Sequence, residues 1–192
     1  AAEYKDVPSI LVALREKQST SAMCLRWIIL TATRSGESRG AKWSEICEAD
    51  AMWKIPASRM KAKLPHDVAL CDEALEILAT MKKRQLENCD FVFPGARGGL
   101  LSDVAVNKTL HAIDDKITVH GFRTSFRTWG AEKTNFDPLV LEFCLSHGDP
   151  NKLQATYART TLPEKRREAL TAWANYIAAK NNVVQLAQIA AG

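Results

Sequence analysis

The sequence predicts a mainly α-helical domain with one small antiparallel β-sheet, an α+β fold. Apolar residues recur at helical spacing along most of the chain, and only residues 51–70 break into short, proline-punctuated segments typical of strands. With 192 residues and 46% hydrophobic content, the chain is long enough to bury one core. No repeat, low-complexity tract or linker divides it. We therefore expect one domain at residues 1–180, followed by a C-terminal tail at residues 181–192.

Helical periodicity places most of the elements. Apolar residues at positions 7, 10, 11 and 14 predict a first helix, and those at 25, 28, 29 and 32 predict a second one after Ser19. Asp72 is a candidate N-cap for a third helix, whose expected apolar face is Leu75, Leu78, Ala79 and Leu86. Further helices are expected after Ser102, at 118–130, 137–146 and 151–157, and along the apolar stripe Leu170, Trp173, Ala174 and Ile177.

The strand region contains the segments "AMWKIP", "SRMK" and "HDVAL". Pro56 and Pro65 interrupt it, and its apolar residues do not follow a helical period. We expect these segments to form the small sheet, with Lys61 on a hairpin.

Charge, cysteine content and hydropathy bound the class of protein. The 26 basic and 22 acidic residues leave a net charge of +4, which suits a polyanionic partner without requiring one. The five cysteines are odd in number and form no Cys-x-x-Cys pair, as expected for reduced thiols of a cytoplasmic protein. No apolar run reaches the ~20 residues that span a bilayer, and no signal peptide is evident. Because the chain starts without methionine, we expect it to be an excised domain.

Several common site motifs are weak or absent. Cys144-x-x-His147 has the spacing of metal ligands, but no second pair stands out, so no metal site is predicted. The run "GARGG" lacks the ending of a phosphate-binding P-loop, and no Gly-x-Ser-x-Gly motif occurs. The basic run "KKRQ" from Lys82 is typical of a solvated helix face.

Seven polar residues remain as candidates, although each also has an ordinary structural explanation. The pair Arg34 and Glu37 could be an ion pair at the end of an apolar helix, and Lys61 could be solvated. Both histidines near helix ends could be caps. A surface arginine and a core-edge tyrosine would explain the other two. The set is Arg34, Glu37, Lys61, His120, Arg123, His147 and Tyr157.

In this order, the seven residues resemble the catalytic domain of the tyrosine recombinase, or phage integrase, family. The similar segments are "TATRSGESRGAKWSEI", "RMKAKLPHDVAL", "TVHGFRTSFRTWGAE" and "LSHGDPNKLQATYARTTLPEKRREALTAWANYI". "HGFR" and "LSHG" are specific when a tyrosine follows ten residues later, and the flanking words resemble the prophage-integrase branch. Ala32 and Thr33 depart from the pattern, since many relatives have glycine before the arginine.

The resemblance implies the integrase catalytic core fold and DNA strand cleavage and rejoining through a 3′-phosphotyrosyl intermediate. Two arginines can bind the non-bridging oxygens of a phosphate without a metal, and the set requires no cofactor. Tyr157 would be the nucleophile, His120 its helper, His147 a third donor and Lys61 the proton donor to the leaving oxygen, while Glu37 would hold Arg34.

The resemblance also implies partners. These are double-stranded attachment-site DNA, a homotetramer on synapsed DNA, and accessory DNA-bending or directionality proteins. An upstream DNA-binding domain is expected outside this sequence, and no membrane is involved. The site of action would be the bacterial cytoplasm, at the nucleoid. We expect the apolar tail segment, residues 183–191, to pack on a neighbouring protomer.

Two other functions remain open at this point. A type IB topoisomerase uses a similar set of Arg, Lys, His and Tyr, but it would relax supercoils as a monomer. A helical DNA-binding module could keep the fold without catalysis. Supercoil relaxation without pairing of two sites would favour the first, and binding without covalent capture would favour the second.

Overall fold

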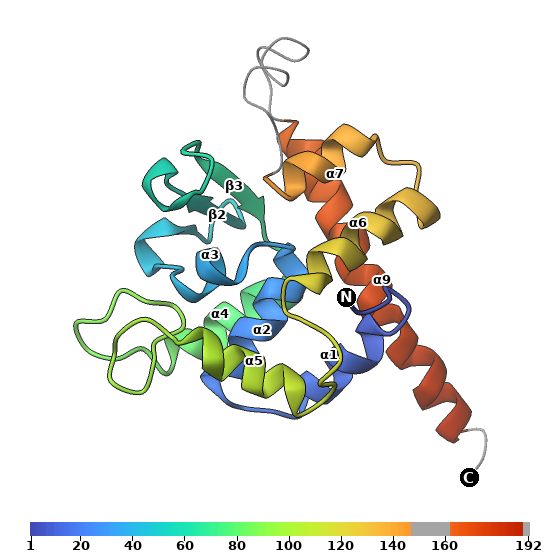
Figure 1. The fold of residues 1–192 in the computed structure, drawn as a ribbon, viewed down its shortest axis with the longest axis horizontal. Coiled ribbons are helices and arrows are strands. Elements are labelled where there is room, and N and C mark those ends of the chain that lie inside the picture. The colour runs from blue at the N-terminus through green and yellow to red at the C-terminus, as the bar shows by residue number, and fades with distance from the viewer. Residues whose placement is uncertain (147–161, 190–192) are drawn as a thin grey trace.

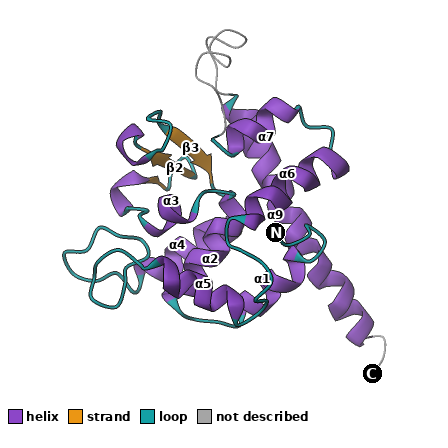
Figure 2. Cartoon of the chain, in the orientation of Figure 1, coloured by secondary structure: helices purple, strands orange, loops and turns teal. Residues whose placement is uncertain are grey.

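The computed structural model describes residues 1–146 and 162–189, the last eleven of these in their backbone alone. Helices dominate, and the strands form one small antiparallel sheet at one side, as predicted (Figure 2). The elements are α1 (Val7–Arg15), α2 (Thr20–Thr31), α3 (Ser35–Arg39), η1 (Trp43–Glu45), β1 (Ile46–Cys47), β2 (Met52–Ile55), η2 (Ala57–Arg59), β3 (His66–Ala69), α4 (Asp72–Lys82), α5 (Asp103–His111), α6 (Gly121–Lys133), α7 (Pro138–Cys144) and α9 (Pro163–Ile189).

Helix α2 forms the centre of the fold. Every residue from position 22 to position 31 is buried, because α1, α4, α5 and α9 pack around the helix (Figure 1). Trp27 anchors this core, with its ring 5.4 Å from that of Trp53 and 5.7 Å from that of Phe93. Such aromatic pairs stabilise a core beyond their buried area alone. The C-terminal end of α2 is thus a fixed point, and the chain leaves it directly towards Arg34.

A second aromatic cluster joins α6 and α9 to α2. The Trp173 ring lies 5.2 Å from Trp129 and 5.8 Å from Phe126, and its Nε1 donates to the carbonyl of Ile29 at 2.8 Å. The predicted stripe on α9 is confirmed, since Leu170, Trp173, Ala174 and Ile177 are all buried. Helix α9 continues to Ile189, so most of the predicted tail segment has helical backbone.

The sheet has the order β1-β2-β3, with antiparallel pairing throughout. Trp53 pairs with Val68, and Ile55 with His66. The "SRMK" segment was predicted to be a strand, and this is wrong, because η2 and a turn occupy it. Pro56 has no N–H to donate to a sheet ladder and has the φ of −70° that suits a turn. The two residues of β1 were not predicted, because so short a strand shows no alternation.

Two expectations about α4 are wrong. Its N-cap is Cys71, which makes no side-chain cap, and Asp72 is the first helical residue. Its buried face is also shifted from the predicted one. Leu86 lies beyond the end of the helix with 43% of its surface exposed. The buried residues follow the helical spacing i, i+3, i+4, i+7 and are Ala74, Ile77, Leu78 and Met81.

The predicted starts of two helices, α5 and α7, agree with the structure. Ser102 caps α5 by accepting from the backbone N–H of Ala105 at 3.1 Å. Asp137 caps α7 by accepting from the N–H of Leu139 at 2.9 Å. The helix predicted at 151–157 lies outside the described residues.

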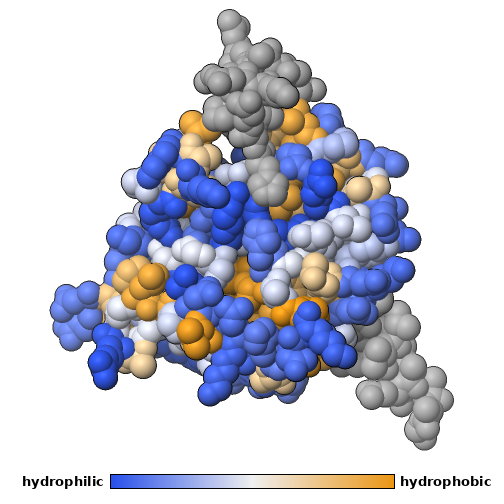
Figure 3. All heavy atoms as spheres, in the orientation of Figure 1, coloured by the Kyte–Doolittle hydropathy of each residue, from blue (hydrophilic) through white to orange (hydrophobic). Residues whose placement is uncertain are grey.

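The surface in Figure 3 is mostly hydrophilic, with hydrophobic residues in separate small areas. In the described part of the chain, no helix combines the length and the apolar character needed to span a bilayer.

Candidate active site

Arg34 occupies the N-cap of α3, directly after the end of α2. Ala32 turns the chain with a left-handed φ of 52°, and Arg34 then returns to extended backbone. Glycine adopts this left-handed region more easily than alanine does. Alanine at position 32 therefore holds a conformation that suits glycine better. Arg34 is therefore the N-cap of a new short helix. The sequence had instead suggested that Arg34 lies at the end of the apolar helix.

Three hydroxyl groups hold this turn. The Thr31 Oγ1 donates to the carbonyl of Trp27 at 2.7 Å and lies 2.9 Å from the Thr33 Oγ1. The Thr33 Oγ1 lies 2.6 Å from the Ser38 Oγ. All three hydroxyl-bearing residues are buried. The polar network ties the last turn of α2 to α3 and so fixes the backbone from which Arg34 projects.

Glu37 binds Arg34 at two places. One carboxylate oxygen accepts from the Arg34 backbone N–H at 2.9 Å, and the other accepts from its Nη1 at 2.8 Å. Glu37 is only 5% exposed, whereas the Arg34 side chain is 27% exposed. The predicted pairing of these two residues is confirmed. The carboxylate orients the guanidinium of a side chain that stays partly exposed.

Arg123 projects from the first turn of α6 into the interior. Its Nη1 donates to the carbonyl of Ala32 and its Nη2 to the carbonyl of Leu145, each at 2.5 Å. The residue is 3% exposed. Burial, followed by the charge of Arg34, lowers the pKa of Arg123 to about 10, while the Glu37 carboxylate opposes this shift. Arg123 therefore links the end of α2 to the end of α7.

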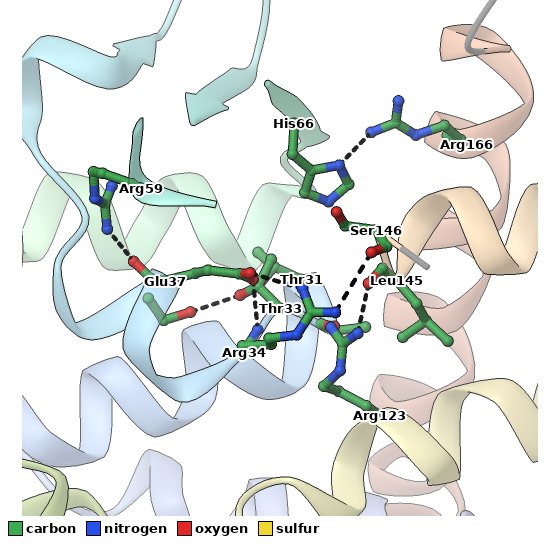
Figure 4. Close-up of polar contacts among 12 residues, drawn as sticks. Thr31, Thr33, Arg34, Glu37, Arg59, His66, Arg123, Leu145, Ser146 and Arg166 are labelled. Carbon is green, nitrogen blue, oxygen red and sulfur yellow. Dashed lines mark hydrogen bonds and ion pairs between the residues drawn. The ribbon is translucent and has the colours of Figure 1, made fainter. Parts of the chain in front are cut away.

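The two guanidinium groups approach the same end of α7. Arg34 Nη2 donates to the carbonyl of Ser146 at 3.4 Å, next to the Leu145 carbonyl that binds Arg123 (Figure 4). The Glu37 carboxylate acts on both arginines, and the Glu142 carboxylate also acts on Arg123. Planar guanidinium groups suit the bidentate binding of phosphate oxygens. Of these two, the Arg34 side chain is partly exposed, whereas both Nη atoms of the buried Arg123 donate to carbonyl groups.

Lys61 lies in the exposed turn between η2 and β3, as the hairpin prediction requires. The turn, residues 61–65, begins after Met60, which is buried. Arg59, two residues before Lys61, donates to the Glu37 carbonyl and pairs with Glu45. The start of the lysine turn is thus connected to the residue that orients Arg34.

His120 and Arg123 lie one helical turn apart, as predicted, but in different surroundings. His120 is the N-cap of α6, is exposed, and its side chain makes no capping hydrogen bond. The alternative interpretation as a capping histidine is therefore wrong. Its backbone carbonyl accepts from the Arg123 N–H at 3.1 Å. The exposed imidazole of His120 is accessible to a group of another molecule or segment.

His147 and Tyr157 lie outside the described residues, so their placement stays a prediction. The described chain before them ends at Ser146, which has a left-handed φ of 48°. This residue follows the carbonyl of Leu145, to which Arg123 donates. The two carbonyl groups that bind the arginines thus belong to the last two residues described before this gap.

Two buried basic residues next to the site were not predicted from the sequence. His66, the first residue of β3, and Arg166 of α9 are each 5% exposed. His66 Nδ1 lies 3.4 Å from Arg166 Nη2, and Arg166 also donates to the carbonyl of Asp67. The alternation of His66 with Val68 could have marked the histidine as inward-facing, because side chains two apart share a face of a strand. No comparable signal marked Arg166.

The groups that converge on the end of α7 are cationic hydrogen-bond donors, which favour an anion as the ligand. Among the described side chains, residues 1–146 and 162–178, no three of His, Cys, Asp or Glu gather closely enough to hold a metal ion.

The chain is similar in sequence to known proteins. Residues 3–163 match the model described as the phage integrase family. The prophage integrase IntA of Escherichia coli K12 is 33% identical over 182 residues, which cover 92% of this chain and 44% of that protein. IntZ of the same strain is 34% identical over 176 residues, covering 90% and 43%. This chain thus spans under half the length of these relatives.

Solved structures show the same fold. A XerH site-specific recombinase bound to its difH substrate superposes with a TM-score of 0.61 at 18% identity, covering 85% of this chain and 51% of that one. The XerA recombinase superposes with a TM-score of 0.58 at 16% identity, covering 83% and 61%. The predicted catalytic core fold is therefore confirmed.

Proposed function

We propose, on the premise that this chain belongs to the phage integrase family, that it is the catalytic domain of a site-specific DNA recombinase of prophage type. The observation that carries the proposal is the approach of Arg34 and Arg123 to the same end of α7. The two residues are 89 positions apart in the sequence (123 − 34), and the fold brings them together.

The arginine pair supports phosphoryl transfer. In the transition state, negative charge lies on the non-bridging oxygens of the scissile phosphate. Donors fixed before the reaction stabilise this charge without reorganisation, and in many enzymes this stabilisation is the main source of the rate acceleration. Arg123 is fixed by two carbonyl groups and Arg34 by Glu37. His147 is proposed as a further donor to the same oxygens.

The covalent step then uses Tyr157. Its phenolic oxygen attacks the phosphorus and the bond to the 5′ oxygen breaks, giving a 3′-phosphotyrosyl protein and a free 5′-hydroxyl. A phenol with a pKa of ~10 needs help to lose its proton. We assign this help to His120 together with the nearby positive charge. Lys61 gives a proton to the leaving 5′ oxygen. The reverse reaction with another 5′-hydroxyl reseals the strand without ATP, metal or other cofactor.

The proposed partner is double-stranded attachment-site DNA. Proteins of similar structure include a lambda integrase dimer bound to a COC′ core site and a Tn1549 transposon integrase in complex with circular intermediate DNA. We further propose a homotetramer on two paired sites, with the segment after residue 180 packing on a neighbouring protomer, and accessory DNA-bending or directionality proteins. The reaction would take place in the bacterial cytoplasm, at the nucleoid.

The test is covalent capture on nicked DNA. The protein expressed from its complete gene is incubated, with EDTA present, with flanking DNA carrying a nick that lets the 5′-hydroxyl fragment escape. After nuclease digestion, mass spectrometry should find a nucleotide on Tyr157, and Tyr157→Phe should show none. DNA that is bound without forming any adduct would favour a binding module. An adduct together with supercoil relaxation, but without pairing of two sites, would favour a topoisomerase.

A further inference from the structure

His66 lies where three parts of the site meet. It is the first residue of β3 and follows directly on the exposed turn that carries Lys61. On one side its Nδ1 faces Arg166 of α9 at 3.4 Å. The backbone of Cys144, at the end of α7, lies close enough to act on the pKa of the ring. The carbonyl groups that bind Arg123 and Arg34 belong to the next two residues. Figure 4 shows the ring between Arg166 and Ser146.

The chemistry of the contact with Arg166 defines the state of the imidazole. A guanidinium group only donates hydrogen bonds, so Nδ1 must present its lone pair to Arg166. The single ring proton of the neutral imidazole is then on Nε2. A protonated imidazole would turn an N–H towards the guanidinium and lose this contact.

The charges around His66 agree with a neutral ring. Burial is the main cause that lowers its pKa to about 3, and the cations Arg166, Arg123 and Arg34 lower it further. Only the backbone of Cys144 acts in the opposite direction. The ring is therefore neutral in the field of three arginines.

The opposite end of the lysine turn is also fixed. Arg59 holds it through Glu37 and Glu45, and Met60 is buried. Between these two ends lie five exposed residues, 61–65. A turn of this length allows Lys61 only a limited set of positions. The placement of the two ends of the turn decides which of these positions Lys61 can occupy.

We propose that His66, as the neutral Nε2–H tautomer, is a positioning residue for Lys61: it fixes the end of the lysine turn against α7 and α9, so that the ammonium group reaches the 5′ oxygen of the phosphate held by Arg34 and Arg123. This inference rests on the proposed function, because it assumes that Lys61 is the proton donor. Arg166 acts with it by donating both to the ring and to the carbonyl of Asp67.

The test compares two substitutions in the complete protein. In His66→Gln, the amide can accept from Arg166 and donate from its nitrogen, whereas His66→Leu has a similar volume and can do neither. We expect His66→Leu to lower the rate of cleavage at saturating DNA by about 10²-fold, the loss typical of a displaced general acid. His66→Gln should restore most of the rate, and both variants should bind DNA as the wild type does.

A substrate with sulfur in place of the leaving 5′ oxygen separates positioning from a general structural role. A thiolate leaves without a proton, so this DNA does not need Lys61. It should restore cleavage by Lys61→Ala and His66→Leu but not by Arg34→Gln. If the sulfur substrate leaves His66→Leu as slow as the normal DNA does, the positioning role is wrong.

Nitrogen NMR of the free protein tests the tautomer without any DNA. The long-range ¹⁵N–¹H pattern of His66 should be that of the Nε2–H form and should stay unchanged from neutral pH down to about pH 5, well below the usual histidine pKa of ~6.5. An Nδ1–H pattern, or titration near the usual value, would overturn the proposal. If the wild type forms no adduct on bound DNA, the proposed function fails, whereas the NMR result remains informative about His66.

Discussion

The Arg59 guanidinium donates from Nη2 to the backbone carbonyl of Glu37 at 2.5 Å. The carboxylate of the same Glu37 binds Arg34, so one residue connects the start of the lysine turn to a predicted catalytic arginine. Arg59 also pairs with Glu45, which accepts from Trp53 Nε1 at 2.9 Å. Glycine at position 40 makes room for this arrangement, because a Cβ there would lie 2.7 Å from Arg59 Nη2.

Arg59→Lys should therefore weaken both stability and cleavage. Lysine keeps the charge, but its single nitrogen cannot reach the Glu37 carbonyl and Glu45 in the same geometry. We expect the free energy of unfolding to fall by about 1 to 3 kcal/mol, since a buried hydrogen-bond acceptor loses its donor. Urea unfolding measures the first effect, and the rate of Tyr157 adduct formation measures the second.

Arg127→Lys is the matched control for this change. Arg127 pairs with Glu142 at 2.5 Å, but its side chain is 65% exposed. Exposed ion pairs contribute ~1 kcal/mol or less, so this variant should unfold nearly as the wild type does. Equal losses in the two variants would mean that Arg59 has no special part in the network.

The sequence predicted those parts of the site that local pattern and motif encode. Arg34 and Glu37 are three residues apart, and their pairing follows from that spacing within one short helix. Lys61 was placed on its turn by the prolines and the strand segments around it. The motif around Arg123 was recognised, but its burial was not, because the carbonyl groups that bind it come from residues 32 and 145.

The missed residues depend on contacts between distant elements. His66 and Arg166 are 100 positions apart, and only the packing of β3 against α9 brings them together. The left-handed Ala32 could not be predicted either, because alanine gives no local sign of that conformation. Sequence periodicity describes the faces of single elements, whereas these features arise between elements.

Gly130→Ala should destabilise the contact between α6 and α7. A Cβ at position 130 would lie 2.5 Å from Leu141 Cδ1 and 2.8 Å from its Cδ2, and Leu141 is buried. Overpacking of this kind costs about 1 to 3 kcal/mol, which outweighs the gain in helix propensity. Urea unfolding should show the loss. Gly36→Ala in α3 is the control, because a Cβ there meets nothing within 4 Å and should be neutral or slightly stabilising. A stabilised Gly130→Ala would contradict the packing.

Sulfate should bind at the arginine pair in the absence of DNA. Sulfate has the charge and tetrahedral oxygens of a phosphate, and the Arg34 side chain is partly exposed. At a sulfate concentration of about ten times Kd, binding would stabilise the folded protein by ~1.4 kcal/mol. The measurement is the free energy of unfolding in sodium sulfate against sodium chloride at equal ionic strength.

Sulfate also stabilises proteins in general, so this experiment needs two variants. Arg34→Gln removes one of the paired guanidinium groups and should lose the specific part of the stabilisation. Arg127→Gln removes an exposed arginine elsewhere and should keep it. If all three proteins gain equally, sulfate has no site at the arginine pair.

The low pKa of His66 predicts a pH-dependent stability that His66→Gln removes. The pKa is about 3 in the folded protein against an ordinary value of 6.5. Below pH ~6.5 the unfolded chain takes up a proton that the folded chain does not, so stability falls by up to about 1.4 kcal/mol per pH unit until the folded pKa is reached. Between pH 7 and pH 5, the wild type should lose about 2 kcal/mol more than His66→Gln in urea unfolding, because the acidic groups shared by both proteins cancel in the difference. Parallel losses in the two proteins would mean that His66 is protonated in the fold, in conflict with the contact from Arg166.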